Sequence, residues 1–219
     1  MRIVHWLLVF GIAGSYATHQ AGIEYFRYHV WFGYLVVALA SFRLIWGLIG
    51  TRHARFWNFL RGPRATADYV ARLVRGETAA QAGHNPLGGW MVLFLLLALF
   101  AQGVSGLFAN DEIFNTGPLY GYVSDALSLK LTSWHRRLFD WILIAVAVHV
   151  AAVLWHRLFK KEDLIRPMFT GRKAAHAVGD SDAISSSRLW IAALVLALVV
   201  GTLGWFVLRA PAPAVAGFE

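Results

Sequence analysis

The chain contains no cysteine in its 219 residues. This absence excludes disulfide bonds, cysteine-ligated iron–sulfur clusters, thiolate zinc sites and the Cys-x-x-Cys-His attachment of a covalent haem. Charge is also scarce, because 15% of the residues are Asp, Glu, Lys or Arg while 58% are hydrophobic. So few charges cannot cover the surface of a soluble domain, and the composition is typical of a membrane protein.

The hydrophobic residues are gathered into five segments, each near the roughly 20 residues that a membrane-spanning helix needs. These segments cover residues 3–19, 30–49, 87–108, 138–155 and 189–208. They predict an all-α integral membrane protein. The first segment also has features of a cleavable signal peptide, but the pair His5-Trp6 inside its apolar run is unusual for a signal.

Basic residues are concentrated in two of the loops between these segments. Six arginines lie within residues 50–86, and seven Lys or Arg residues lie within 156–188. By the positive-inside rule both loops are cytoplasmic, which places the N-terminus in the cytoplasm and the C-terminal tail on the outer side. This topology also explains the net charge of +8 without nucleic-acid binding.

The connecting segments complete the predicted organisation. Residues 63–75 carry apolar side chains at helical spacing and end at Gly76, which predicts a short interfacial helix. Residues 1–175 are expected to form the main membrane domain, residues 176–187 a cytoplasmic linker and residues 188–209 an additional spanning helix. The Pro- and Ala-rich residues 210–219 are expected to be a disordered tail.

Nine histidines are many for a membrane protein, because an ionisable side chain in the bilayer is costly unless it has a partner or a metal. His135 and His149 are separated by 14 residues. This spacing is about 40° short of four helical turns, so both imidazoles lie on one helix face, about 21 Å apart along the axis. Two histidines at these depths suit two non-covalent haems stacked toward opposite sides of a core about 30 Å thick.

Each haem then needs a second axial ligand from another helix. His29 opens the second segment on the outer side, level with His135, and His5 begins the first segment on the inner side, toward His149. We therefore predict two bis-histidine b haems, an outer one between His29 and His135 and an inner one between His5 and His149. His19 lies 14 residues after His5 and is the rival of His29 as outer ligand.

Residues near these histidines are weaker candidates for the same site. Gly33, one turn after His29, leaves room for a porphyrin beside the backbone. Arg43 lies on the same face at the inner level, where it could pair with a haem propionate or extend to the interface. Arg136 could pair with an outer propionate or, like its neighbour Arg137, with Asp140. The remaining histidines are expected at the interface or in solvated loops: His53, His84, His156 and His176.

Several short motifs occur along residues 2–173. They are Arg-Ile-Val-His-Trp at 2–6, His-Val-Trp-Phe-Gly at 29–33, Arg-Leu-Ile-Trp-Gly at 43–47, His-Asn-Pro-Leu-Gly at 84–88, Gly-Pro-Leu at 117–119 and Pro-Met-Phe-Thr-Gly at 167–171. Together with His135 and His149, they resemble the bacterial cytochrome b561 family, which includes the membrane cytochrome b subunits of nickel–iron hydrogenases. The resemblance implies a four-helix core holding two b haems through histidines at the positions of His5, His29, His135 and His149. The fifth segment extends beyond this core.

The resemblance also implies a function in the respiratory chain. Electrons would pass between a periplasmic cytochrome c, dehydrogenase or hydrogenase subunit and the quinone pool of a bacterial inner membrane. The alternative is a stand-alone superoxide:quinone oxidoreductase, for which the basic residues Lys130, Arg136 and Arg137 could attract an anion. An electron-transfer subunit is the expected class, and no residue is predicted to be catalytic. A transporter without haem would leave the matched histidine levels unexplained.

Overall fold

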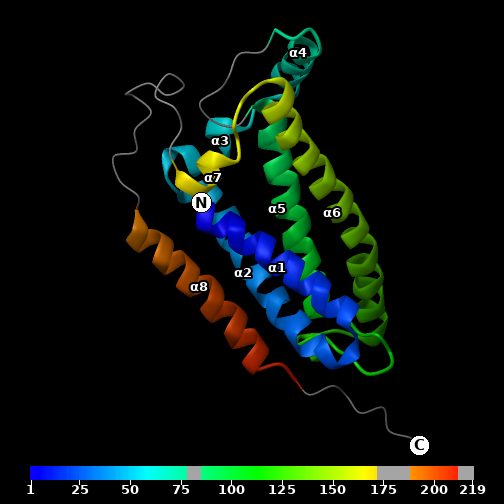
Figure 1. Ribbon diagram of the computed structural model, residues 1–219. Coiled ribbons are helices and arrows are strands. Elements are labelled where there is room, and N and C mark those ends of the chain that lie inside the picture. Colours follow the sequence, from blue (N-terminus) through cyan, green and yellow to red (C-terminus); the bar gives the residue numbers. More distant parts are fainter. Residues whose placement is uncertain (78–84, 172–187, 212–219) are drawn as a thin grey trace, which may run out of the picture.

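The computed structural model describes residues 1–77, 85–171 and 188–211, and within them the chain forms helices and no strand (Figure 1). The long helices are α1 (Arg2–Ala21), α2 (Phe26–Ile49), α5 (Pro86–Leu107), α6 (Asp125–Phe159) and α8 (Leu189–Leu208). The short ones are η1 (Ile23–Tyr25), η2 (Arg52–Ala54), α3 (Phe56–Phe59), α4 (Pro63–Val74), η3 (Tyr120–Tyr122) and α7 (Arg166–Thr170). The predicted all-α architecture is confirmed.

Four helical segments are long and apolar enough to cross a membrane. They are Ile23–Ile49, which is α2 with the turn before it, and the helices α5, α6 and α8. Helix α1 has 20 residues, about 30 Å at 1.5 Å per residue, but His5, His19 and Gln20 make it less apolar. Its predicted place among the spans therefore rests on its position alongside α2 (Figure 1) rather than on its composition.

The short helix predicted at residues 63–75 is present as α4, and its interfacial position stays a prediction. Pro63 stands at its first turn, where a missing N–H removes no helical hydrogen bond. Gly76 follows its end with φ of 77°, a left-handed conformation that glycine adopts at little cost. The predicted linker at 176–187 and residues 212–219 of the predicted tail lie outside the described residues.

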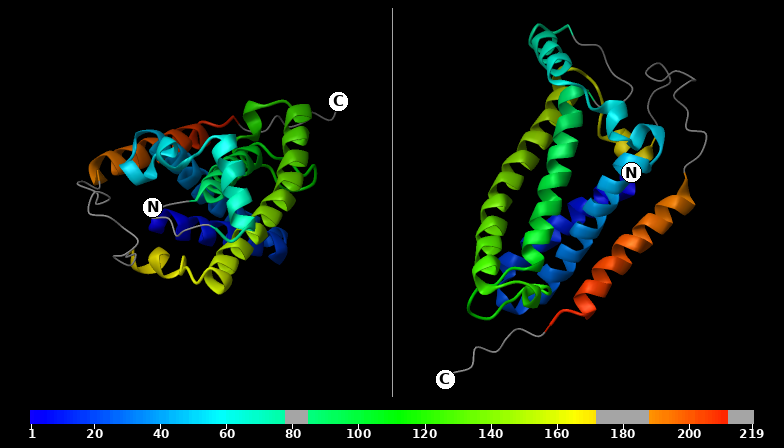
Figure 2. Two further views of the ribbon diagram at one scale, coloured as in Figure 1. Left: turned by 90° about the horizontal axis from the view of Figure 1, so that it is seen from above. Right: turned by 180° about the vertical axis from the view of Figure 1, so that it is seen from behind.

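The helices pack in the order α1, α2, α5, α6, and α8 packs against the outside of α2. Helices α1 and α2 meet α5 and α6 at one end of the bundle and diverge from them toward the end that carries α4 (Figures 1 and 2). The main core lies between α2 and α5, around Leu39, Leu96 and Leu99. Because α6 packs mainly along α5, a second face of α6 is left to confront α1 and α2.

Glycines bring these helices close together. A Cβ atom placed on Gly103 of α5 would lie 2.7 Å from the Cγ2 atom of Val37 on α2, and one on Gly11 of α1 would lie 2.8 Å from Cγ2 of Val36. Both distances are shorter than van der Waals contact. The glycines on α1 and α5 therefore serve helix packing, as small residues commonly do in membranes.

Replacing Gly103 with leucine should destabilise the bundle, because the new side chain has no space between α2 and α5. Overpacking of this kind costs about 1–3 kcal/mol, which chemical denaturation in detergent would measure as a lower free energy of unfolding. Gly201→Leu on α8 is the matched control, since a Cβ atom there meets nothing within 4 Å. Equal stability of the two variants would contradict the close packing of α2 against α5.

Candidate functional site

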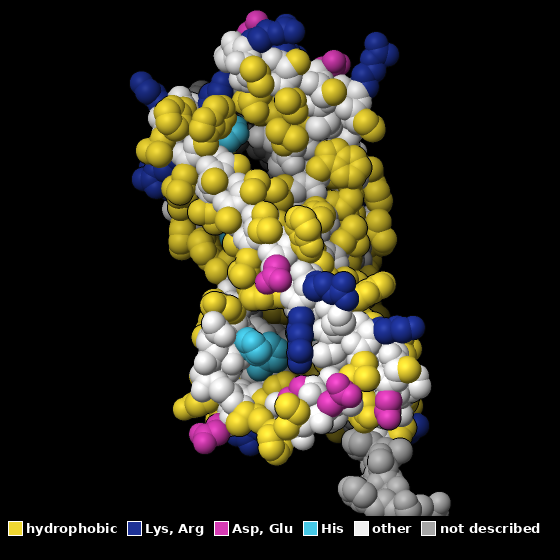
Figure 3. Space-filling view, turned by 90° about the vertical axis from the view of Figure 1, so that its right-hand side faces the viewer, with side chains coloured by type: hydrophobic (Ala, Val, Ile, Leu, Met, Phe, Trp, Pro, Cys, Tyr) yellow, Lys and Arg dark blue, Asp and Glu magenta, His cyan; other side chains and the backbone are white. Residues whose placement is uncertain are grey.

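Two pairs of histidine rings face each other between α6 and the first two helices. His29 of α2 and His135 of α6 have ring centroids 6.2 Å apart. At the other level, His5 of α1 and His149 of α6 have ring centroids 6.5 Å apart. On the side of the molecule formed by α6, histidine side chains are visible at two levels with a largely hydrophobic belt between them (Figure 3). The structure thus brings together the same pairs that helical spacing suggested.

The ring separations suit one metal ion in each pair. Metal–nitrogen bonds of about 2 Å on each side place two imidazole centroids about 6 Å apart. Among the described residues, no group of three His, Cys, Asp or Glu side chains could hold a metal. A metal held by two imidazoles takes its remaining ligands from another molecule, and the macrocycle of a haem supplies them to iron. The donor set therefore fits haem better than a zinc or magnesium ion.

Backbone carbonyls orient the outer pair. The Nδ1 atom of His29 lies 2.9 Å from the carbonyl oxygen of Ser15, and that of His135 lies 2.8 Å from the carbonyl oxygen of Gln102. A carbonyl can only accept, so Nδ1 carries the proton in both rings and Nε2 keeps its lone pair for a metal. Sequence analysis missed both partners, because every residue has a backbone carbonyl and the residue type does not indicate which one accepts a hydrogen bond.

Open space lies beside the outer pair. A Cβ atom on Gly33, one turn after His29, would meet nothing within 4 Å although the residue is half-buried. On the opposite helix, a Cβ atom on Gly106 would lie 2.7 Å from the Cε1 atom of His135. Gly106 thus lets the His135 ring lie against α5, and Gly33 leaves room for a planar group.

His19 belongs to the same level as the outer pair. Its ring centroid is 5.9 Å from that of His29, but the residue is exposed, whereas His29 and His135 are half-buried. Nearby, Tyr16 of α1 stacks on Phe139 of α6 with centroids 5.6 Å apart. The geometry therefore favours His29 as the partner of His135 and places His19 at the edge of the site.

The inner pair is accompanied by polar atoms that lack partners. The Nδ1 atom of His5 and the Nη1 atom of Arg43 are buried and form no hydrogen bond. Arg43 is 8% exposed and lies with its guanidinium carbon 5.2 Å from the centroid of the Phe56 ring. Burial among protein side chains disfavours the interpretation that Arg43 extends to the interface. A buried guanidinium with a free donor needs an anion, and a haem propionate is one.

The arginines at the outer level differ from each other. Arg137 donates to the Ser133 hydroxyl at 2.6 Å, and no ion pair joins Arg136 or Arg137 to Asp140 among the described residues. Arg136 is exposed and follows His135 directly. Arg136 therefore stays the predicted partner of an outer propionate, whereas Arg137 is bound within its own helix.

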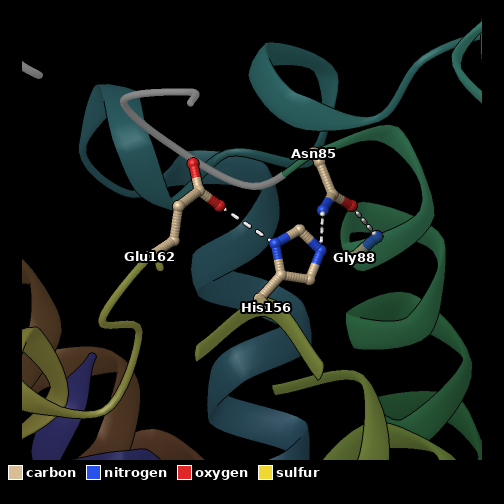
Figure 4. A network of polar contacts seen from close by, with 4 residues as sticks. All are labelled: Asn85, Gly88, His156 and Glu162. Atoms are coloured by element: carbon tan, nitrogen blue, oxygen red, sulfur yellow. Dashed lines mark hydrogen bonds and ion pairs between the residues drawn. The ribbon is translucent and has the colours of Figure 1, made fainter. Parts of the chain in front are cut away.

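His156 lies in a polar network rather than at a bare interface (Figure 4). Its Nδ1 atom donates to Glu162 at 2.9 Å, and its Nε2 atom accepts from the Asn85 amide at 3.5 Å. The Asn85 Oδ1 atom caps α5 by accepting from the Gly88 N–H at 2.7 Å. Burial and the nearby Glu162 carboxylate raise the pKa of the Tyr69 hydroxyl on α4. The network ties the ends of α5 and α6 to the segment that follows α6.

Three histidines lie away from these pairs in the sequence. His53 is exposed in η2, which agrees with its predicted place in a loop. His84 and His176 lie outside the described residues.

Comparison with known families identifies the kind of protein that carries these pairs. Residues 1–171 match the family model of prokaryotic cytochrome b561. The chain belongs to this family. Comparison with curated proteins and with solved structures found no significant match. Members are b-type cytochromes that transfer electrons across membranes, so this cytochrome is an integral membrane protein that binds b-type haem. Helix α8 lies beyond the matched residues.

Replacing Gly33 with leucine should remove the outer haem, leaving about one haem per chain where two are predicted. A Cβ atom at this position meets no other part of the polypeptide within 4 Å, so a loss would report a porphyrin beside it. A pyridine haemochrome assay on protein of known concentration measures the ratio. Gly201→Leu, which also meets open space, should keep the full content. Unchanged haem in Gly33→Leu would contradict a porphyrin beside this glycine.

Replacing Asn85 with alanine should weaken the start of α5 by about 1 kcal/mol, because alanine provides no cap. Asn85→Ser keeps a capping oxygen and loses only the contact with His156, so it should cost less. Hydrogen exchange of the first turn of α5 would compare the two variants. Equal exchange in Asn85→Ala and the unsubstituted protein would show that the cap has no effect on stability.

Proposed function

We propose that this cytochrome holds two b haems and transfers electrons between a periplasmic redox partner and the membrane quinone pool. His29 and His135 bind the outer haem, and His5 and His149 bind the inner one. The observation that carries the proposal is the pair of imidazole–imidazole distances, 6.2 and 6.5 Å, at two levels of α6 about 21 Å apart. One iron fits each pair.

The residues present limit the chemistry at both levels. When bound, haem supplies a one-electron iron couple. With two imidazoles holding each haem, the residues present would leave no place for oxygen to bind, and electron transfer is the activity that fits. The carbonyls of Ser15 and Gln102 hold the outer rings in the tautomer that can bind iron. Arg43 and Arg136 offset the charge of the inner and outer propionates.

The orientation follows from the basic loops. The start of α1, α4 and α7 lie at one end of the molecule (Figure 1). The described segments that precede α4 and α7 carry Arg52, Arg55, Arg61, Lys160 and Lys161. The positive-inside rule puts that end in the cytoplasm of a bacterial inner membrane. The pair His5–His149 is then on the cytoplasmic side, near quinone reduction, and the pair His29–His135 faces a periplasmic cytochrome c, dehydrogenase or hydrogenase subunit.

Haem counting tests this assignment. Protein purified in detergent should show two b haems by its dithionite-reduced minus oxidised spectrum and by pyridine haemochrome. His149→Ala and His29→Ala should each lose one haem, because each removes one axial ligand, and His19→Ala should keep both. Absence of haem in the unsubstituted protein would overturn the proposal. If His19→Ala loses one haem and His29→Ala keeps both, His19 rather than His29 is the outer ligand.

The stand-alone superoxide:quinone oxidoreductase remains the alternative, and one measurement separates the two. The purified chain would be mixed with a short-chain quinone and superoxide as the sole donor. An electron-transfer subunit that depends on a protein partner should reduce quinone slowly under these conditions. Rapid and saturable quinone reduction would favour the stand-alone enzyme.

A further inference from the structure

One acidic side chain lies on the outward face of α6, between the two histidine levels, where the α6 side of the molecule is largely hydrophobic (Figure 3). Asp140 follows His135 by five residues and precedes His149 by nine, which is about 7.5 and 13.5 Å along the axis. Its side chain is exposed and forms no hydrogen bond or ion pair in the part of the chain that the structure describes. A carboxyl group in a bilayer is costly without a partner. The position therefore favours a donor supplied by another molecule.

The residues around Asp140 form a continuous exposed seam along α6. Their spacing alternates between three and four residues, and all of them are exposed: Arg137, Asp140, Ile144, Ala147, Ala151 and Leu154. This alternation averages about 3.5 residues, which is the repeat by which two helices pack side by side. At about 100° per residue, Ile144 lies about 180° from His135 around the helix. The α6 seam therefore faces away from the histidine pairs.

The composition of the α6 seam suits contact with another helix better than contact with lipid alone. Ala147 and Ala151 are one turn apart, and small residues let the backbones of two membrane helices approach each other. Helix α8 provides the comparison, because it exposes large apolar side chains such as Leu194 and Leu198 and contains no charged residue. Lipid tails match such a surface. They do not match the charged outer end of the α6 seam.

Arg137 keeps donors for a contact outside its own helix. Its guanidinium uses two N–H groups on Ser133, at 2.6 Å to the hydroxyl and 3.4 Å to the carbonyl oxygen. An arginine has five such groups. A hollow of about 270 Å³ opens beside it, lined by Trp134, Arg137, Leu138 and Trp141. The remaining N–H groups are therefore accessible to another molecule.

The two charged residues lie on opposite flanks of the α6 seam, which makes the seam complementary to itself. Counted from His135, Arg137 lies at about 200° and Asp140 at about 140°, on either side of Ile144 at about 180°. A two-fold axis along the membrane normal places each flank against the opposite flank of a second copy. Arg137 of each copy then faces Asp140 of the other. Their offset of about 4.5 Å along the axis is within reach of an arginine side chain.

We propose that two copies of this chain pack through the α6 seam as a parallel homodimer, with Arg137 of each copy donating to Asp140 of the other. A second copy fits better than an unrelated helix, because it supplies the opposite charge at the required depth in both directions. The seam lies opposite the histidine face of α6, so the dimer leaves the histidine pairs of both copies uncovered. The dimer therefore does not depend on how many haems each chain binds.

Disulfide cross-linking tests the contact, because the chain has no cysteine of its own. Ile144→Cys would be oxidised in native membranes with copper phenanthroline and analysed on a non-reducing gel. It should form a dimer of twice the chain mass of 24.4 kDa. Leu198→Cys on α8 is the matched control and should stay monomeric, since its exposed fraction of 61% is close to the 53% of Ile144. Equal cross-linking of both variants, cross-linking of neither, or a product of Ile144→Cys with a different protein would overturn the proposal.

Charge reversal tests the pairing within the dimer. In the Ile144→Cys background, Arg137→Asp alone and Asp140→Arg alone each place like charges opposite one another and should reduce cross-linking, whereas the two changes together should restore it. In the cysteine-free protein, Asp140→Ala should raise the dimer dissociation constant about tenfold, equivalent to about 1.4 kcal/mol, as measured by light scattering in detergent. Unchanged haem content confirms that each variant is folded. If folded single reversals cross-link fully, or the folded double reversal does not cross-link, Arg137 and Asp140 do not pair between copies.

Discussion

The high cost of an unpartnered histidine inside a bilayer is the constraint on which the rest of this structure depends. Helix α6 carries two such residues on one face, and it packs mainly along α5. The face with His135 and His149 is therefore left to meet side chains of α1 and α2 rather than their backbones. His29 and His5 stand opposite at about the distance that one iron ion spans. The divergence of α1 and α2 from α5 and α6 therefore leaves the space that the facing histidine pairs need.

The two histidine pairs differ in whether the surrounding protein satisfies their polar atoms. At the outer level, carbonyl groups of Ser15 and Gln102 already hold the rings, and Gly33 borders free space. At the inner level, polar atoms of His5 and Arg43 are buried without partners. An unsatisfied buried donor costs about 1–3 kcal/mol, and a bound haem with its propionates would remove that cost. In the proposed two-haem arrangement, the protein itself would hold the outer histidine rings, whereas the inner site would depend more on its haem.

Much of the fold could be predicted from the sequence, because long apolar segments and helical periodicity are strong local signals. The all-α class, the helix α4 and the proximity of the histidine pairs all follow from these signals. Helix α1 is less apolar than a typical span because it carries His5 and His19, so its membrane placement depends on contacts with α2. For the site, the sequence predicts which side chains take part but not which backbone groups contact them. The carbonyls of Ser15 and Gln102, and the network around His156, depend on which backbones and loops meet.

The N-cap of α5 has a consequence beyond its own helix. Because the Asn85 Oδ1 atom is committed to the Gly88 amide, the Asn85 side chain can present only its NH₂ group to His156. The His156 ring in turn contacts Glu162 in the segment that follows α6. The geometry of one helix terminus therefore joins the start of α5 to the end of α6 through a single imidazole ring.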